Sequence, residues 1–315
     1  MKETKFSVII PHYNIPERLE RLLLTLPLDH EDVQVIVVDD RSDEQTEKLL
    51  DIKSVYQKKG VEFYRNNSGI KGPGTCRNIG IKHAVGKWLI FADADDYFTD
   101  DMYEIISENY SSDADIIYFC PKSTDEVSGE ESDRHLPYVR LIKAYLEKPS
   151  RENELSLRFQ VISPCSKMIK RDIVEKYNVY FGTTIVAQDA VFITKLCCFA
   201  DKIQADAREI YVIVKRSDSL AVGFDREKQK VRTRIFVERC KYLKRNLSPE
   251  EYRILNMNGT NRIIGLIAAG YPMKDILEVA FTYAINGIRP VDFSMINPKT
   301  AIGTFFRLRT DAKRK

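Results

Sequence analysis

The sequence lacks features that would place it among secreted or membrane-spanning proteins. None of its six cysteines forms a C-x-x-C pair, and two of them, Cys197 and Cys198, are adjacent, which is a poor arrangement for a disulfide. We therefore expect reduced thiols and a cytoplasmic protein. Apolar runs such as Ile263–Tyr271 are far shorter than the ~20 residues that span a bilayer. The N-terminus, MKETKFSVIIP, shows neither a long apolar region nor a cleavage site, so we expect no signal peptide.

The chain also lacks a large excess of charge of one sign. The formal net charge is only +3, although 30% of the residues are charged. The chain has no stripe of Lys and Arg interleaved with exposed aromatic residues, so we expect no nucleic-acid partner. With 315 residues, 43% of them hydrophobic, the chain is long enough for one large domain or a domain with an appendage.

The first 120 residues alternate between short apolar runs and amphipathic runs. We expect strands in FSVIIP, VQVIVVDD, VEFYRN, KWLIFAD and ADIIYFC, and helices in PERLERLLLTL, DEQTEKLLDIKSVY, GTCRNIGIKHAV and DMYEIISENY. Strands this apolar are usually covered on both faces, as in parallel sheets. The pattern therefore predicts an α/β fold with an open, helix-flanked sheet that binds its ligand at the carboxyl ends of the strands.

The rest of the chain has a different pattern. We expect an exposed loop over Pro121–His135, which is polar and rich in turn residues, followed by further strand and helix signals. From about Asp225 onward the periodicity is helical, and Ser248 with Glu251 predicts a capping box. We therefore divide the chain into an α/β part, residues 1–224, and a helical part, residues 225–315.

A cluster of acidic residues directly follows one of the predicted core strands, in GKWLIFADADDYF. Asp93, Asp95 and Asp96 follow this strand, and Asp39 and Asp40 end another strand, so both groups should lie on the same edge of the sheet. Crowded carboxylates repel one another unless a cation is present. Mg²⁺ in proteins typically binds one or two carboxylates together with substrate phosphates. The acidic cluster thus predicts a metal that bridges the protein to a diphosphate. The alternative is that these residues form a solvated turn that caps the next helix.

A glycine-rich loop, NNSGIKGPGTCRN, opens one of the predicted helices. Backbone N–H groups at the start of a helix attract phosphate. The loop contains no G-K-[S/T], so it is not a P-loop. It is either a phosphate-binding loop or a plain connection.

Together these motifs resemble a known family. SVIIPHYN, VIVVDDRSDEQT, NNSGIKGPGTCRNIGIKHAVGKWLIFADADD and VAQDAVF occur in the order and spacing of family 2 glycosyltransferases, and the resemblance covers about Lys5–Val222. These enzymes have the GT-A fold, typically invert the anomeric centre and use nucleotide-sugar donors. The resemblance implies a GT-A catalytic domain in residues 1–224. Its nucleotide-binding half would be about 1–120 and its acceptor-binding half about 121–224, with a helical appendage in 225–315.

The resemblance also assigns donor-binding residues. Pro11 and Tyr13 would form the nucleobase edge, and Asp40 would accept hydrogen bonds from the base, commonly uracil. Lys71 and Arg77 would contact the base or the diphosphate. Without the family pattern, Tyr13 is an ordinary packing residue and the two cations are ordinary exposed charges.

The family resemblance also assigns roles to the acidic cluster and to a later loop. Asp93 would contact the ribose, and Asp95 would bind Mn²⁺ or Mg²⁺. Arg216, together with Ser219, would contact the diphosphate. The family usually has DDGS where this chain has DDRS, so the backbone at Arg41 is expected to suit a residue other than glycine.

Inversion needs a base that deprotonates the acceptor hydroxyl as it attacks, and a carboxylate within hydrogen-bond reach can do this. The family's base is the Asp of a Glu-Asp pair, and the matching residues here are Gln188 and Asp189. Asp189 is therefore the predicted base. Gln188 cannot ionise, so it is expected to bind the acceptor. The alternative is that Asp189 merely caps the helix that follows it.

The favoured hypothesis is a metal-dependent inverting glycosyltransferase. It would move a hexose or N-acetylhexosamine from a nucleotide-sugar, expected to be a UDP-sugar, to a saccharide or lipid-linked saccharide acceptor. The product would be a bacterial cell-surface glycan such as capsule, O-antigen or teichoic acid. A nucleotidyltransferase is the alternative within enzymes, although it would normally have a glycine-rich loop after the first strand. A non-catalytic sugar-binding or scaffold protein is the third hypothesis.

Two hypotheses concern the C-terminal region. The end of the chain, RLRTDAKRK, has five basic residues in nine and could rest on an anionic membrane surface. A solvated tail is the alternative. The C-terminal helices are also candidates for acceptor binding or for homo-oligomer formation.

Overall fold

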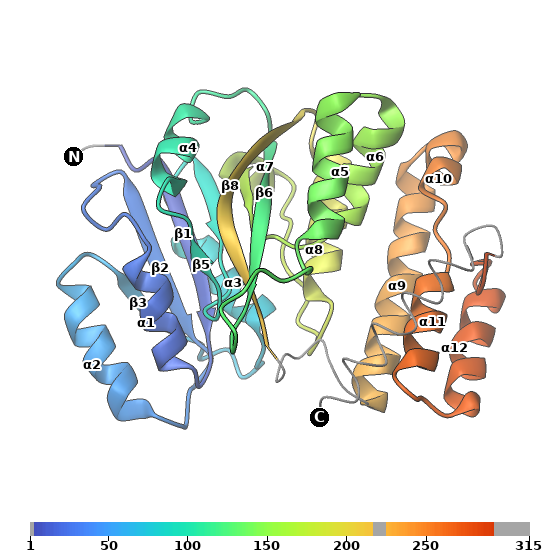
Figure 1. The fold of residues 1–315 in the computed structure, drawn as a ribbon, viewed down its shortest axis with the longest axis horizontal. Coiled ribbons are helices and arrows are strands. Elements are labelled where there is room, and N and C mark those ends of the chain that lie inside the picture. Colours follow the sequence, from blue (N-terminus) through green and yellow to red (C-terminus); the bar gives the residue numbers. More distant parts are fainter. Residues whose placement is uncertain (1–2, 217–224, 293–315) are drawn as a thin grey trace. The chain divides into compact units, whose positions relative to one another are not determined.

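The computed structural model describes residues 3–216 and 225–292. Two compact units divide the chain, Met1–Lys215 and Arg216–Lys315. The first unit (Figure 1) contains eight strands: β1 (Phe6–His12), β2 (Val33–Asp39), β3 (Glu62–Arg65), β4 (Trp88–Phe91), β5 (Tyr97–Phe98), β6 (Ile116–Asp125), β7 (Lys167–Lys170) and β8 (Ile203–Lys215). Its helices are α1 (Pro16–Leu24), α2 (Thr46–Gln57), α3 (Pro73–His83), α4 (Met102–Glu108), α5 (Leu136–Glu147), α6 (Arg151–Gln160), α7 (Arg171–Lys176) and α8 (Gln188–Phe199).

The strands form one mixed sheet in the order β3-β2-β1-β4-β7-β6-β8-β5. β1 pairs in parallel with β2 on one side and with β4 on the other. β7 then runs antiparallel between β4 and β6, and β6 pairs in parallel with β8. All seven residues of β1 are buried, as expected for a strand with helices over both faces of its sheet. The predicted α/β fold is confirmed.

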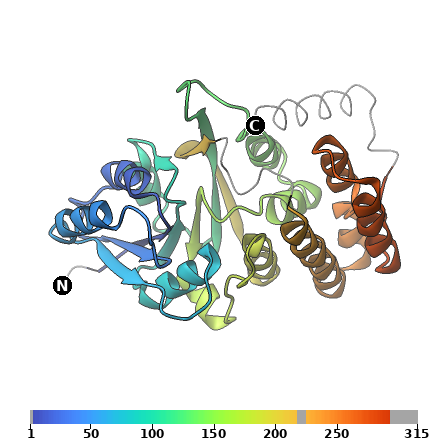
Figure 2. The ribbon, with the colours of Figure 1, turned by 90° about the horizontal axis from the view of Figure 1, so that it is seen from below.

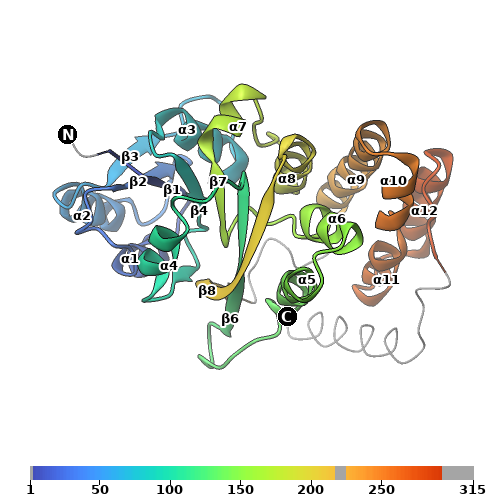
Figure 3. The same cartoon turned by 90° about the horizontal axis from the view of Figure 1, so that it is seen from above.

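Helices cover both faces of the parallel half of this sheet. Viewed along the sheet, α1 and α4 lie on one side of the strands and α3 and α7 lie on the other (Figures 2 and 3). The buried residues of α1 include Leu19, Leu22 and Leu23, whose spacing of three to four residues gives the helix one apolar face. Burial of this face against the sheet holds the connections at the ends of the strands in fixed positions.

The carboxyl ends of β2 and β4 meet at one edge of the sheet, because both strands run parallel to β1 between them. Asp40 directly follows β2, and Asp93 follows β4 after a single intervening residue, Ala92. The two acidic groups therefore lie on the same edge.

One predicted loop is wrong in part. We expected an exposed loop over Pro121–His135, but β6 continues to Asp125 and pairs with β8 as far as Lys215. Polar side chains can occupy this strand because they have partners inside the protein. Ser123, which is fully buried, has its hydroxyl 2.7 Å from Nδ1 of His135. A buried polar group with a partner costs little, so polarity alone does not indicate a loop.

The second unit is helical, with α9 (Arg226–Asn246), α10 (Pro249–Leu255), α11 (Thr260–Ala268) and α12 (Met273–Ile285). The predicted capping box is confirmed, since Ser248 accepts from the backbone N–H of Glu251 and Glu251 accepts from that of Ser248. A separate apolar core, which includes Leu266, Val279 and Tyr283, holds these helices together. Among the described residues, no helix is both long and apolar enough to cross a membrane.

An unusual cation lies within the core of the first unit. Lys167 in β7 is only 1% exposed, donates a hydrogen bond to the carbonyl of Ser163 and places Nζ 4.9 Å from the centre of the Tyr118 ring. Among residues 3–216 and 225–292, no carboxylate forms an ion pair with it. Burial lowers the pKa of Lys167 from 10.5 to about 8.

We expect Lys167→Met to stabilise the first unit near neutral pH. Below pH 8 the folded protein must bury a charged ammonium, and this cost is relieved as pH rises from about 8 to 10.5, because only the unfolded chain then keeps the proton. The shift corresponds to roughly 3 kcal/mol, so the variant should gain about 1–3 kcal/mol at pH 7 and lose the rise in stability above pH 8. Urea unfolding across this pH range measures both effects. Lys195→Met, which removes an exposed lysine, should change neither.

Candidate active site

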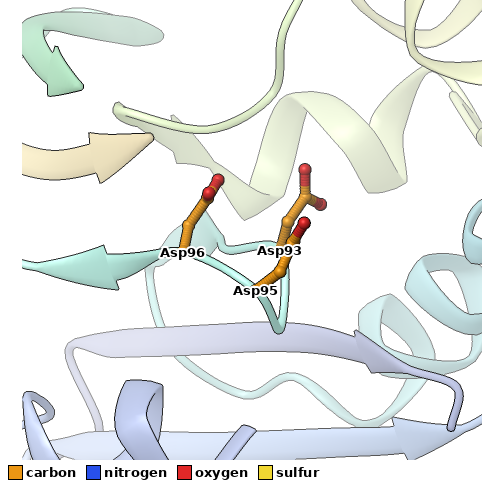
Figure 4. Close-up of side chains that lie close together, drawn as sticks. All are labelled: Asp93, Asp95 and Asp96. Atoms are coloured by element: carbon orange, nitrogen blue, oxygen red, sulfur yellow. The ribbon is translucent and has the colours of Figure 1, made fainter. Parts of the chain in front are cut away.

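The loop after β4 brings three carboxylates together (Figure 4). Oxygen atoms of Asp93, Asp95 and Asp96 all lie within 4.8 Å of one another. Asp96 is 5% exposed and accepts hydrogen bonds from the Tyr211 hydroxyl and the Val214 backbone N–H, both at 2.8 Å. Burial raises the pKa of Asp96 well above its usual value, and the charges of Asp95 and Asp93 raise it further. Asp96 is thus fixed to β8, whereas Asp93 and Asp95 are half-buried.

This donor set fits a hard divalent cation. Carboxylate oxygens are the ligands that Mg²⁺ and Mn²⁺ prefer, and a cation relieves the repulsion among three crowded acids. The partial exposure of Asp93 and Asp95 is also compatible with additional ligands from a substrate phosphate. Asp95 is therefore the residue that would hold the metal, with Asp93 beside it and Asp96 supporting their loop.

A single buried arginine joins this loop to a second element. The Arg77 side chain in α3 is 3% exposed and donates to Asp93 and, at 2.8 Å, to Oδ1 of Asp189. Its guanidinium also lies 5.2 Å from the centre of the Phe181 ring. Burial alone would lower the pKa of Arg77, but Asp189 and Asp93 outweigh it and raise the pKa, so the side chain is a permanent cation. Arg77 was predicted to face the base or diphosphate, and the structure places it between two carboxylates.

Asp189 is the second residue of α8, and its side chain is 31% exposed. Its side-chain hydrogen bond within the described residues comes from Arg77 rather than from a backbone N–H of α8, so the helix-cap alternative gains no support. Burial raises the pKa of Asp189, with Arg77 and Lys167 acting in the opposite direction. Ala187, which precedes Gln188 and Asp189, has a left-handed backbone conformation with φ 60°. Such strain in a residue other than glycine often accompanies a functional site.

Gln188 lies beside Asp189 and is 6% exposed. A Cβ atom on Gly74 would overlap the carbonyl oxygen of Gly182 and lie 3.0 Å from Cγ of Gln188, so glycine permits α3 to approach this segment closely. Oε1 of Gln188 has no hydrogen-bond partner among residues 3–216 and 225–292. A buried amide oxygen without a partner is costly, so a hydroxyl group that donates to Oε1 would stabilise this side chain.

The predicted nucleobase edge is built around Asp40. Asp40 is 6% exposed, and its two oxygens accept hydrogen bonds from Nδ2 of Asn66 at 2.6 Å and from the backbone N–H of Gly72 at 2.7 Å. Gly72 has φ +136°, a conformation that favours glycine. Because a carboxylate has about four lone-pair sites, Asp40 retains acceptor capacity after these two bonds.

The other residues of this edge lie on β1 and the glycine-rich loop. Pro11 is buried near the end of β1, and Tyr13 follows the strand with 42% of its surface exposed. Nζ of Lys71 lies 4.2 Å from the centre of the Tyr13 ring, so the cation covers one face of the aromatic side chain. The two residues thus lie together, with Tyr13 still largely accessible.

The expectation for Arg41 is wrong. Its φ is +63°, in the left-handed region that glycine adopts most easily, although the side chain is arginine. The following turn explains how this backbone is held, because the carboxylate of Asp39 accepts hydrogen bonds from both the backbone N–H and the hydroxyl of Ser42. The turn therefore keeps the conformation of a glycine-containing loop without the glycine.

Sequence reasoning missed one residue that organises the acidic loop. The Tyr211 hydroxyl donates to Asp96 and accepts from the backbone N–H of Asp93 at 2.9 Å, and the side chain is fully buried. Tyr211 lies in an apolar strand more than a hundred residues from the loop, and tyrosine is common in such strands. The sequence carried no local signal for this contact.

Two predicted residues are not placed with the others. Arg216 directly follows β8 and is the first residue of the second unit, whose position relative to the site is not described. Ser219 lies outside the described residues. The roles of both remain predictions.

A small pocket of about 10 Å³ lies in the half of the unit that was predicted to bind the acceptor. Its lining comes mainly from β6, α5 and the segment before β7, and includes Tyr138, Ser163, Cys165, Lys167 and Tyr211. Tyr211 thus contributes both to this pocket and to the acidic loop. The pocket combines aromatic and apolar walls with a few polar groups, and its space suits a single water molecule rather than a sugar.

A helix-flanked sheet with an acidic loop at one edge and a carboxylate on a facing helix defines the GT-A class of nucleotide-sugar transferase folds. The chain belongs to glycosyl transferase family 2, whose sequence profile matches residues 7–178. The predicted family and fold are therefore confirmed.

Several relatives are named for reactions on one kind of polymer. The chain is 28% identical over 66% of its length to the Staphylococcus aureus (strain MW2) poly(ribitol-phosphate) beta-N-acetylglucosaminyltransferase TarS, and covers 35% of that protein. It is 31% identical over 67% of its length to the poly(ribitol-phosphate) beta-glucosyltransferase of Bacillus spizizenii, and covers 32% of it. The chain thus spans about a third of the length of these curated relatives.

Solved structures share the fold. The crystal structure of S. aureus TarS 1–349 in complex with UDP-GlcNAc matches with a TM-score of 0.71 and 19% identity, over 98% of this chain and 90% of that chain. A Pyrobaculum calidifontis mannosyltransferase in complex with GDP-Man and Mn²⁺ matches with a TM-score of 0.59 and 15% identity, over 99% and 84%.

Proposed function

We propose that this chain is an inverting, metal-dependent glycosyltransferase that moves a hexose or N-acetylhexosamine from a UDP-sugar to an acceptor hydroxyl of a cell-surface glycan. The observation that carries this proposal is the buried Arg77, which brings the acidic loop after β4 and the carboxylate of Asp189 to one place. A sugar donor held at the first would present its anomeric carbon near the second. Family membership supports the same reaction class.

In this proposal the donor lies along the edge of the sheet. Tyr13 stacks on the base, Asp40 accepts its hydrogen bonds, and Pro11 shapes the edge beside them. Asp93 contacts the ribose, and Lys71, whose Nζ lies 4.2 Å from the centre of the Tyr13 ring, contacts the base or the diphosphate. Support comes from the shared edge of β2 and β4 and from the exposed ring of Tyr13.

Asp189 would act as the base. It would take the proton from the acceptor hydroxyl as the oxygen attacks the anomeric carbon, on the side opposite the departing nucleoside diphosphate. Mn²⁺ or Mg²⁺, held by Asp95, would supply positive charge to the departing diphosphate. Gln188 would offer its unpartnered amide oxygen to another hydroxyl of the acceptor. Arg77 holds Asp189 and Asp93 in their relative positions.

The acceptor is proposed to be a saccharide or polyol-phosphate chain, such as a teichoic acid, in free or lipid-linked form. The support is the pair of relatives whose names specify poly(ribitol-phosphate). We keep membrane contact through residues 307–315 and homo-oligomer formation as hypotheses. Residues 307–315 lie outside the described part of the chain.

A panel of nucleotide-sugars tests the proposed function. UDP-glucose, UDP-GlcNAc and GDP-mannose would be compared for binding by calorimetry with Mn²⁺, with Mg²⁺ and with EDTA, and for transfer to poly(ribitol phosphate). We expect a UDP-sugar to bind most tightly, and to bind at least about tenfold more tightly with a divalent ion than with EDTA. Tightest binding of a nucleoside triphosphate, with release of pyrophosphate, would favour a nucleotidyltransferase instead. Equal binding with EDTA would remove the metal from the proposal.

A further inference from the structure

The α12 helix has two apolar faces. Ile276, Val279 and Tyr283 form the first and pack in the core of the second unit, against α9 and α11. The second runs along the helix at every fourth position and is exposed to solvent: Met273 (66%), Leu277 (60%), Phe281 (66%) and Ile285 (65%). We call these four residues the α12 stripe. An ordinary surface helix has one apolar face, so the second one needs an explanation.

The four residues of the α12 stripe are clustered rather than scattered over the surface. Four of the fifteen large hydrophobic side chains that are exposed in the described residues lie on this one helix of thirteen residues. Single exposed apolar residues need no explanation, whereas a contiguous row of them marks an interaction surface. A spacing of four residues places neighbouring members one above the other along the helix.

Charge distinguishes the second unit from the first. Residues 216–315 contain 20 Lys and Arg but 10 Asp and Glu, a formal charge of +10, which leaves −7 for residues 1–215 of the total of +3. Exposed cations lie near both ends of the stripe. Lys274 follows Met273 on α12, and Arg289, whose side chain is 66% exposed and pairs with Asp292, follows Ile285 by four residues. The helix itself also carries two acidic residues, Asp275 and Glu278.

We propose that the α12 stripe inserts into the surface of an anionic lipid membrane, with the basic charge of the second unit drawn to the lipid headgroups. Helices of this kind lie in the plane of the interface, with large apolar side chains among the acyl chains and cations at the headgroups. Each Lys or Arg near an anionic leaflet adds about 1 kcal/mol of attraction. None of the four stripe residues belongs to the proposed active site, so the inference goes beyond the proposed function.

A second copy of the chain fits the stripe less well. Four side chains expose on the order of a few hundred Å² of apolar surface, whereas a stable interface buries about 800 Å² on each partner. Two copies would also bring together units that each carry +10. An anionic surface complements this charge and needs no extensive shape match.

The test is co-sedimentation of the full chain with lipid vesicles. The protein should bind vesicles of phosphatidylglycerol and phosphatidylethanolamine and bind weakly to phosphatidylcholine alone. The double variant Leu277→Ser/Phe281→Ser should reduce the partition coefficient on anionic vesicles by at least about tenfold. The matched control is Leu24→Ser/Leu50→Ser, which removes two leucines of similar exposure, 70% and 62%, from the first unit and should bind like the wild type.

Other outcomes would overturn the proposal. Unchanged binding by the α12 variant, with loss on deletion of residues 307–315, would assign the membrane contact to the basic end alone. A dimer in analytical ultracentrifugation that the α12 variant abolishes, without binding to vesicles, would assign the stripe to a second copy. Because every substituted side chain is exposed, far-ultraviolet circular dichroism should confirm an unchanged fold for each variant.

Discussion

Asp189→Asn should lower kcat for sugar transfer by about 10³-fold while changing the Kd for the UDP-sugar by less than about twofold. The amide has nearly the shape of the carboxylate, and its oxygen can still accept the hydrogen bond from Arg77. It cannot take a proton from an attacking hydroxyl, and general base catalysis contributes 10²–10⁴-fold. Transfer assays at saturating acceptor, combined with calorimetry of donor binding, separate the two quantities.

A second carboxylate tests whether this loss comes from helix stability instead. Asp172 occupies the first turn of α7, as Asp189 does in α8, but it is exposed. Asp172→Asn should transfer normally. If Asp189→Asn also transfers normally, or loses activity only in proportion to a lower melting temperature, Asp189 is not the base. Because burial raises the pKa of Asp189, wild-type kcat should fall on acidification at a pH above the usual Asp value of about 4.

Much of the fold follows from periodicity in the sequence. The four apolar runs that became β1, β2, β4 and the start of β6 are buried strands, and the Ser248 capping box forms as expected. These features depend on residues close together in the chain, where pattern and propensity act directly. The continuation of β6 to Asp125 depends instead on pairing with β8, about ninety residues later, so local polarity pointed to a loop.

The shared edge for Asp40 and Asp93 could be predicted, because parallel strands end on the same side. The contact between Arg77 and Asp189 could not, because it joins residues 112 positions apart. The family resemblance gave both residues a role separately, and only tertiary packing shows that they touch. Similarly, the polar partner of Asp96 is a tyrosine on β8, which its local sequence does not distinguish from other core aromatics.

Hydrogen bonds within a turn explain the backbone conformation of Arg41, which the sequence did not predict. Arg41 was expected to avoid a glycine-like conformation and nonetheless has φ +63°. A left-handed residue costs roughly 1 kcal/mol, which the hydrogen bonds between Asp39 and Ser42 can offset. The sequence correctly indicated that a left-handed backbone at Arg41 is unfavourable. It did not reveal the hydrogen bonds between side chains of the same turn that offset this free-energy cost.

Asp95→Asn should remove metal-dependent donor binding, with a rise of at least about tenfold in the Kd for the UDP-sugar in the presence of Mn²⁺. Asp96 is fixed by Tyr211 and Val214, and Asp93 by Arg77. Asp95 is half-buried in the same loop and is the predicted metal ligand. An amide lacks the negative charge that holds a hard cation against water, so the variant should bind the ion weakly. Titration of Mn²⁺ alone, followed by paramagnetic broadening of water protons, measures this step without any turnover.

Asp100→Asn is the matched control, since Asp100 lies five residues further along the chain and is exposed. It should leave both affinities unchanged. In Asp95→Asn the Kd for the donor in EDTA should equal that of the wild type in EDTA, because the contacts to the base at Asp40 and Tyr13 remain. Wild-type affinity for Mn²⁺ in Asp95→Asn would mean that Asp93 and Asp96 hold the ion without it. Arg77 would then need a role beyond that of a fixed bridge, because it must release Asp93 before that carboxylate can bind metal fully.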